Sequence, residues 1–251
     1  MTPITDVVTY ASHEGVATIT INRPDKLNAI SADVEQGLIV AWNRFNASPE
    51  DRVAVLTGAG DRAFSSGRDK ETTEPPDYRR FTPGVVIEVD KPVIAAVAGW
   101  CVGGAIAIVQ MCDLCVAAEN TKFVYPEVKM GFAGGLIASL AGRIPHKVAM
   151  ELMLLGEEIS VERAYQVGFV NRVVPVGQQV IEAQKLAHRM AQHAPLVMGM
   201  LKRFANEVLP KSPVEKSALA LRETEAVFTS EDFKEGLSSF QQKRQPHFTG
   251  R

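Results

Sequence analysis

The stretch from Pro92 to Met111 constrains the fold more than any other part of the chain. Its first half, Pro92–Gly99 (PVIAAVAG), is short and apolar, which is typical of a buried strand. The second half follows a double glycine, Gly103–Gly104, and is apolar on every side up to Met111. This pattern predicts a helix buried in a core. Two glycines at such a junction indicate that the main chain closely approaches another group.

Other short apolar segments predict further strands around this one. They are Val53–Gly58 and Asp113–Glu119, together with a hairpin from Val7–Tyr10 and Val16–Ile21. Ser31 is placed to cap a helix with an apolar stripe. Because strands alternate with helices, we expect parallel pairing and an α/β core.

Two regions have a different character. Residues 68–84 are polar, charged and rich in proline, and predict a mobile surface loop with at most a short helix. After residue 175 the pattern becomes helical, punctuated by prolines. The helices are expected at Val180–Met190, Leu196–Leu209, Val214–Phe228 and Glu231–Gln242. We therefore divide the chain into an α/β core, residues 1–195, and a C-terminal helical region, residues 196–251.

Composition excludes several classes of protein. The chain has 251 residues, 22% of them charged, and a formal net charge of -2, so a strongly basic nucleic-acid-binding surface is not expected. No apolar run reaches the 18 residues of a membrane span, and the N-terminus lacks the pattern of a signal peptide. Three cysteines, Cys101, Cys112 and Cys115, predict buried structural thiols in a cytoplasmic protein.

Three stretches carry the functional signal when they are taken together. They are AFSSGRD (Ala63–Asp69), AGWCVGGAIAIVQMCD (Ala98–Asp113) and FVYPEVKMGFAGG (Phe123–Gly135). With INRPDKLNAI near the start and KEGLSSFQQKR near the end, the chain resembles the crotonase superfamily, the enoyl-CoA hydratase/isomerase family, over nearly its whole length. The resemblance implies a crotonase-like α/β spiral of repeated ββα units with a C-terminal helical region that forms trimers or hexamers.

The resemblance also implies an oxyanion hole. Chemistry beside a thioester carbonyl produces an enolate, and two main-chain N–H groups aimed at its oxygen can stabilise the charge by roughly 3 kcal/mol each. By resemblance, the donors are the amides of Ser66 and Gly104. Considered without the resemblance, Gly103 and Gly104 are better explained by tight packing of a strand against a helix.

One of the two carboxylates of the family's hydratases is missing here. Alignment on the double glycine places Ala107 where those hydratases carry a glutamate, and Ala107 cannot exchange a proton. The second glutamate is retained as Glu127, which is expected to act as general base or acid. Burial near an apolar acyl pocket would raise its pKa into a useful range.

This loss bears on the reaction. One carboxylate suffices to move a proton from C2 to C4, so the sequence favours an enoyl-CoA isomerase or a specialised crotonase, with hydration or dehydration still open. A second group could come from Asp69, Glu71, Glu74, Asp77 or Tyr78, although each is expected to be solvated. The alternatives are an acyl-CoA hydrolase, lyase or decarboxylase on the same fold, or a non-catalytic relative that binds acyl-CoA or RNA.

The resemblance finally assigns residues to coenzyme A. They are Lys26 and Leu27 in the early segment, Ser66, Gly67, Arg68 and Asp69 around the first oxyanion loop, and Phe240 and Lys243 near the C-terminus, often reaching a neighbouring subunit. Arg68 is also suited to a substrate carboxylate. Cys101 and Tyr125 flank the site and are expected to serve in packing. No cofactor beyond the coenzyme A moiety of the substrate is expected, and no metal, nucleic acid or membrane.

Overall fold

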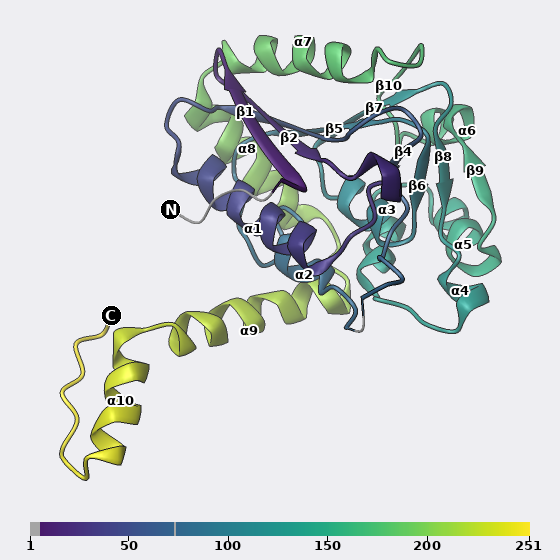
Figure 1. The fold of residues 1–251 in the computed structure, drawn as a ribbon. Helices are drawn as coiled ribbons and strands as arrows, with labels where there is room; N and C mark the ends of the chain where they lie inside the picture. The colour runs from purple at the N-terminus through teal and green to yellow at the C-terminus, as the bar shows by residue number, and fades with distance from the viewer. Residues whose placement is uncertain (1–5, 73) are drawn as a thin grey trace.

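Two β-sheets form the body of the molecule in a computed structural model, which describes residues 6–72 and 74–251 (Figure 1). The larger sheet has the order β1-β2-β3-β5-β7-β10 and the smaller one β4-β6-β8-β9. The strands of the larger sheet are β1 (Val8–His13), β2 (Val16–Ile21), β3 (Val53–Gly58), β5 (Val93–Val97), β7 (Leu114–Ala118) and β10 (Arg172–Val174). Those of the smaller sheet are β4 (Ala63–Ser65), β6 (Trp100–Val102), β8 (Lys122–Val124) and β9 (Glu158–Ser160).

Consecutive strands alternate between the two sheets. β3, β5 and β7 pair in parallel in the larger sheet, while β4, β6 and β8 pair in parallel in the smaller one. Only the outer pairs β1/β2 and β8/β9 are antiparallel. Each chain turn therefore adds one strand to each sheet, and the predicted α/β spiral is confirmed.

The larger sheet is buried on both faces, as a parallel sheet requires. Along β3, Ala54 and Leu56 pack into the main core, while Val53 and Val55 face the opposite side. Helix α1 (Ala32–Ala47) covers one face, and α7 (Gln179–Ala191) lies across the other (Figure 1). The side chain of Ser31 accepts a hydrogen bond from the Val34 amide, so the predicted cap is confirmed.

The remaining helices surround the smaller sheet and form the C-terminal region. The short ones are η1 (Pro24–Lys26), α2 (Tyr78–Phe81), α3 (Gly104–Val109), α4 (Glu127–Met130), η2 (Leu136–Gly142) and α6 (Val161–Gln166). The longer ones are α5 (His146–Leu155), α8 (Pro195–Val208), α9 (Pro213–Phe228) and α10 (Glu231–Gln241). The expected C-terminal helices are thus confirmed.

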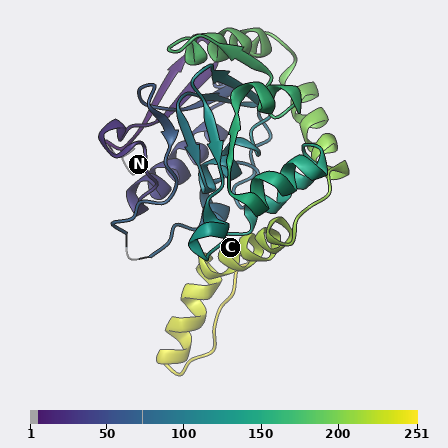
Figure 2. The ribbon, with the colours of Figure 1, turned by 90° about the vertical axis from the view of Figure 1, so that its right-hand side faces the viewer.

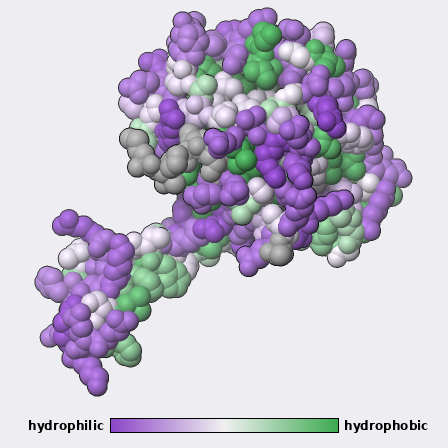
Figure 3. Space-filling view, in the orientation of Figure 1, coloured by the Kyte–Doolittle hydropathy of each residue, from purple (hydrophilic) through white to green (hydrophobic). Residues whose placement is uncertain are grey.

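Helices α9 and α10 form an arm that leaves the body, as the two views of the ribbon show (Figures 1 and 2). Helix α8 is tied to the body by Lys202, whose Nζ lies 2.8 Å from both the Asp113 carboxylate and the Lys91 carbonyl. The inner part of α9 is held there as well, because Arg222 donates to the Val85 carbonyl at 3.0 Å. Along the arm, apolar residues reach the surface between polar ones (Figure 3). They include Val227, Phe228, Leu237 and Phe240.

The segment 68–84 contains the short helix that its sequence allowed, but it does not lie wholly on the surface as predicted. Tyr78–Phe81 form α2, and Phe81 is completely buried in the main core. The indole N–H of Trp42 on α1 donates to the Phe81 carbonyl at 2.9 Å. Two aromatic residues, Tyr78 and Phe81, draw this otherwise polar segment inward, and a reading based on average polarity misses them.

The cysteines are free thiols, as expected. Cys101 and Cys115 are buried and Cys112 is half-buried. Burial raises the pKa of Cys115 to about 12 and that of Cys101 well above its ordinary value, so both remain protonated. Within residues 6–72 and 74–251, no helix is both long and apolar enough to cross a membrane.

Candidate active site

Three parallel strands of the smaller sheet bring the three motif stretches together. Ser65 pairs with Cys101 between β4 and β6, and Cys101 pairs with Phe123 between β6 and β8. Because parallel strands end at the same edge of a sheet, the residues that follow them become neighbours. These are the Ser66–Arg68 loop after β4, the double glycine after β6 and Glu127 after β8.

Contacts with the main chain explain why these loops carry glycines. Gly67 has φ +83°, and a Cβ there would lie 2.8 Å from the Val102 carbonyl oxygen. Gly103 has φ +60°, and a Cβ on it would overlap the carboxylate of Glu127. A Cβ on Gly104 would overlap the ring of Tyr78. The double glycine therefore lets two side chains, Glu127 and Tyr78, lie directly against the main chain.

Glu127 is a buried acid with the properties of a proton-transfer group. It opens α4, and only 6% of its surface is exposed. Burial raises its pKa from 4.5 to about 7, opposed by a backbone hydrogen bond. Its Oε2 atom is buried and has no hydrogen-bond partner among the described residues. A carboxyl group with this pKa is able both to accept and to release a proton near neutral pH.

The two main-chain amides named from sequence differ in their availability. Gly104 is the first residue of α3, where an N–H group has no acceptor within the helix. The Ser66 amide, however, donates to the Leu27 carbonyl at 2.9 Å. It cannot serve a thioester oxygen while that bond is made, and no sequence pattern indicates this pairing.

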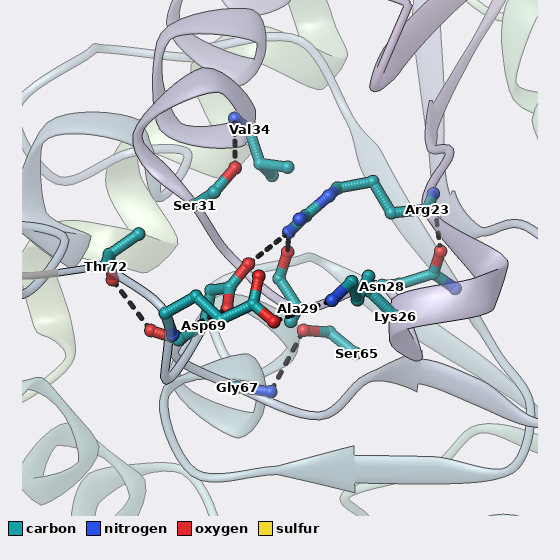
Figure 4. Close-up of polar contacts among 11 residues, drawn as sticks. Arg23, Lys26, Asn28, Ala29, Ser31, Val34, Ser65, Gly67, Asp69 and Thr72 are labelled. Carbon is teal, nitrogen blue, oxygen red and sulfur yellow. Dashed lines mark hydrogen bonds and ion pairs between the residues drawn. The ribbon is translucent and has the colours of Figure 1, made fainter.

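An ion pair ties the loop after β4, residues 66–69 (the first oxyanion loop), to residues 23–29 (the early segment) (Figure 4). Arg23 Nη1 lies 2.8 Å from Asp69 Oδ2 and 2.7 Å from the Ala29 carbonyl, to which it donates. The other oxygen of Asp69 accepts a hydrogen bond from the Glu71 amide at 3.0 Å. The Glu71 amide and the Arg23 guanidinium together lower the pKa of Asp69. We call this arrangement the Arg23–Asp69 clamp; Asp69 is engaged in it and is not a second acid.

Asn28 completes the link between the early segment and the sheet, and sequence reasoning did not single it out. Leu27 and Asn28 both have positive φ, 50° and 54°. The Asn28 side chain accepts from the Arg23 amide and donates to the carbonyls of Ala59 and Ala63. Asparagine tolerates the left-handed region better than most residues, which is the signal that could have identified it.

The residues assigned to coenzyme A fall into two groups. One group lies around the clamp and comprises Lys26, Leu27, Ser66, Gly67, Arg68 and Asp69. The exposed Lys26 ammonium is 2.7 Å from Glu71 Oε1. The Arg68 guanidinium donates to the Thr72 carbonyl at 3.0 Å.

The other two residues assigned to coenzyme A belong to the arm. Phe240 lies on α10 and Lys243 just beyond it, and α10 stands away from the body within one chain (Figure 1). A single copy of the chain does not bring the two groups together.

Ala107 lies in apolar surroundings. It belongs to a cluster with Val85, Val86, Leu136 and Ala218, against which Tyr78 also packs. Of the residues suggested as a second acid or base, Tyr78 is the one that lies against the double glycine. Its expected solvation is wrong, because its hydroxyl oxygen is buried.

Other groups near the site fit roles in packing. Cys101 is completely buried on β6, and Tyr125 is 5% exposed just before Glu127. Burial raises the pKa of Tyr125 to about 12. Among residues 6–72 and 74–251, no group of three or more His, Cys, Asp or Glu side chains is arranged to hold a metal ion.

Comparison with known proteins agrees with this geometry. The enoyl-CoA hydratase/isomerase family model matches residues 11–251. The chain is 36% identical to an (E)-benzylidenesuccinyl-CoA hydratase of Thauera aromatica, with 97% of this chain and 99% of that protein covered. It is 35% identical to a carnitinyl-CoA dehydratase of Salmonella paratyphi A, with 93% of this chain and 94% of that protein covered.

Solved structures of the same kind share the fold. A carnitinyl-CoA dehydratase from Mycobacterium avium 104 superposes with a TM-score of 0.77 at 35% identity, covering 98% of this chain and all of that one. An enoyl-CoA hydratase from Mycobacterium tuberculosis H37Rv gives a TM-score of 0.76 at 33% identity, with the same coverage. The chain has the crotonase fold and is an enzyme of the enoyl-CoA hydratase/isomerase family.

Proposed function

We propose that this enzyme adds water to, or removes it from, the C2–C3 bond of an acyl-CoA thioester, with Glu127 as the acid–base group. The observation that carries the proposal is the buried Glu127 carboxyl, whose pKa is raised to about 7, held against the double glycine. The hydratase and dehydratase names of the relatives support this direction over other reactions of the family.

The proposed chemistry uses Glu127 twice. Its carboxylate takes a proton from water as the water oxygen bonds to C3, and the C2–C3 π electrons move into the thioester as an enolate. The Gly104 amide donates to the enolate oxygen. The protonated Glu127 then returns its proton to C2, so that one water molecule is added and the carboxylate is regenerated. Dehydration follows the same steps in reverse.

The thioester is proposed to bind along the first oxyanion loop. Lys26 and Leu27, with Ser66, Gly67, Arg68 and Asp69, would support the coenzyme A moiety. Asp69 would do so by holding the loop in place, since its carboxylate is already paired with Arg23. Phe240 and Lys243 would contribute from a neighbouring subunit. No cofactor beyond coenzyme A is needed for these steps.

Double-bond isomerisation is the second candidate, and Ala107 is the observation that favours it. Residue 107 lies in an apolar cluster and carries no carboxylate. Of the two carboxylates expected in the family's hydratases, this chain therefore retains Glu127. It could carry a proton from C2 to C4 without activating water. Incubation of a 2-enoyl-CoA and a 3-enoyl-CoA in ¹⁸O-labelled water, followed by mass spectrometry, separates incorporation of oxygen from migration of the bond.

Glu127→Gln is the variant that tests the catalytic assignment. The amide keeps the size of the side chain but cannot exchange a proton, so turnover should fall by a factor of at least about 10². Acyl-CoA affinity, measured by calorimetry, should stay within a few-fold of the unaltered enzyme. Glu151→Gln, an exposed residue of α5, is the matched control and should leave turnover unchanged. Unchanged turnover in Glu127→Gln would refute the assignment.

A further inference from the structure

The α2 segment places a hydroxyl-bearing side chain, Tyr78, against the same turn that Glu127 contacts. The ring of Tyr78 lies against Gly104, and its nearest atoms are Cζ and the two Cε carbons, at the hydroxyl end. The hydroxyl is therefore close to the Gly104 main chain. On the adjacent glycine, Gly103, the contact is with the Glu127 carboxylate.

The Tyr78 hydroxyl is buried and makes no hydrogen bond to any described residue. Leaving a polar group in this state costs free energy, and native structures rarely do so without a reason. The cost is hard to explain by packing alone, because phenylalanine would fill the same space without it. Oε2 of Glu127 is likewise buried without a hydrogen-bond partner among the described residues. The two side chains that lie against Gly103 and Gly104 therefore each carry an unpartnered oxygen.

The surroundings keep this hydroxyl protonated. Burial, together with the negative charge of Glu127, raises the pKa of Tyr78 above its ordinary value of 10. The Tyr78 hydroxyl is therefore a neutral donor throughout the working pH range and a poor base. The cluster that contains Ala107 also packs against the same ring.

We propose that Tyr78 is a catalytic residue whose hydroxyl donates a hydrogen bond to the oxygen of the thioester as it becomes an enolate. It acts beside the Gly104 amide as a second donor, because the Ser66 amide already donates to the Leu27 carbonyl. The role rests on the proposed function, since it requires an enolate. No proton is transferred from Tyr78: the hydroxyl stays intact and the hydrogen bond strengthens as charge moves onto the oxygen.

The test compares Tyr78→Phe with the unaltered enzyme in two reactions. The first is hydration of crotonyl-CoA, which is monitored through the loss of absorbance of the enoyl group. The second is exchange of the C2 protons of butyryl-CoA in D₂O, read by mass spectrometry, which needs the enolate but no water addition. Removing one donor to an oxyanion lowers kcat by about 10² to 10³, so both rates should fall by about that factor with KM within a few-fold.

Tyr10→Phe is the matched control. The Tyr10 hydroxyl is also partly buried, but it donates to Asp51 at 2.6 Å, on β1 and away from the site, so both rates should be unchanged. Tyr78→Phe keeps the ring that packs against Gly104, and its melting temperature should not fall below that of the unaltered enzyme.

The outcomes separate the hydroxyl's role from the proposed function. Rates of Tyr78→Phe within twofold of the unaltered enzyme in both reactions would overturn the role of Tyr78. So would loss of hydration with normal C2 exchange, which would place the hydroxyl on the attacking water. If the unaltered enzyme catalysed neither reaction with either thioester, the proposed function itself would fall, and this role with it.

Discussion

At the scale of single residues, Glu127 connects activity to stability. The folded chain disfavours its charged form, because burial raises its pKa from 4.5 to about 7. Folding then favours the protonated carboxyl, so its contribution to stability is fully present below about pH 4.5. That contribution is lost as the pH rises through about 7. A carboxyl tuned for proton transfer thus weakens the fold at neutral pH, which is a common property of active sites.

Glu127→Gln should therefore stabilise the protein more at about pH 8 than at about pH 5. The glutamine carries no charge at either pH, so the difference between the two gains should be on the order of 2 kcal/mol. Urea unfolding of both proteins at the two pH values measures it. Glu151→Gln should shift stability equally at both. A gain that is the same at the two pH values for Glu127→Gln would mean that burial does not shift this carboxyl as described.

At the scale of elements, the site depends on how firmly the early segment is held to the first oxyanion loop. Two ion pairs join them, and they differ in burial. In the Arg23–Asp69 clamp the side chains are 17% and 8% exposed, whereas in Lys26–Glu71 they are 52% and 71% exposed. Removing one partner of a buried pair leaves the other charge without compensation, but an exposed pair contributes little.

Asp69→Ala should accordingly lower the free energy of unfolding by about 3 kcal/mol, and Lys26→Ala should lower it much less. Denaturant unfolding of the two variants gives the comparison. Because its hydrogen bonds and Arg23 lower the pKa of Asp69, the effect of Asp69→Ala should shrink as the pH falls below about 4. Similar losses in the two variants would show that the clamp does not hold the loop.

The elements themselves were largely predictable from sequence, and the side-chain contacts between them were not. Apolar runs and the cap at Ser31 gave the strands, the buried helix and the C-terminal helices, because local patterns determine them. The pairing of the Ser66 amide with Leu27 depends on two segments meeting in space, and no local pattern records it. Tyr78 was misjudged for a related reason, since its burial follows from Phe81 entering the core beside it.

At the scale of the whole molecule, the outer part of the arm, from the last turns of α9 through α10, is not covered by the described body of the chain. Phe240 is 85% exposed, and Val227, Phe228 and Leu237 are more than half exposed. In α10 the only buried residue is Ser239. An apolar helical arm of this kind gains stability by packing against another copy of the chain.

The expected assembly is a trimer or a dimer of trimers, as the family resemblance implied. Light scattering after gel filtration should give three or six times the mass of one chain. Phe240→Ser should shift the distribution towards smaller species, while Tyr165→Ser, an exposed aromatic residue of the body, should not. A monomer at micromolar concentration would contradict the expectation and leave Phe240 and Lys243 without a thioester to reach.

The turn at Gly103–Gly104 also limits how this enzyme can diverge. No side chain fits at either position, because Glu127 and Tyr78 already occupy the space above the main chain. New specificities must therefore arise around the turn, at positions such as 107, while the turn itself stays unchanged. Directed evolution of the enzyme would do best to leave residues 78, 103 and 104 unvaried and place its diversity on the face of α3 that meets α2.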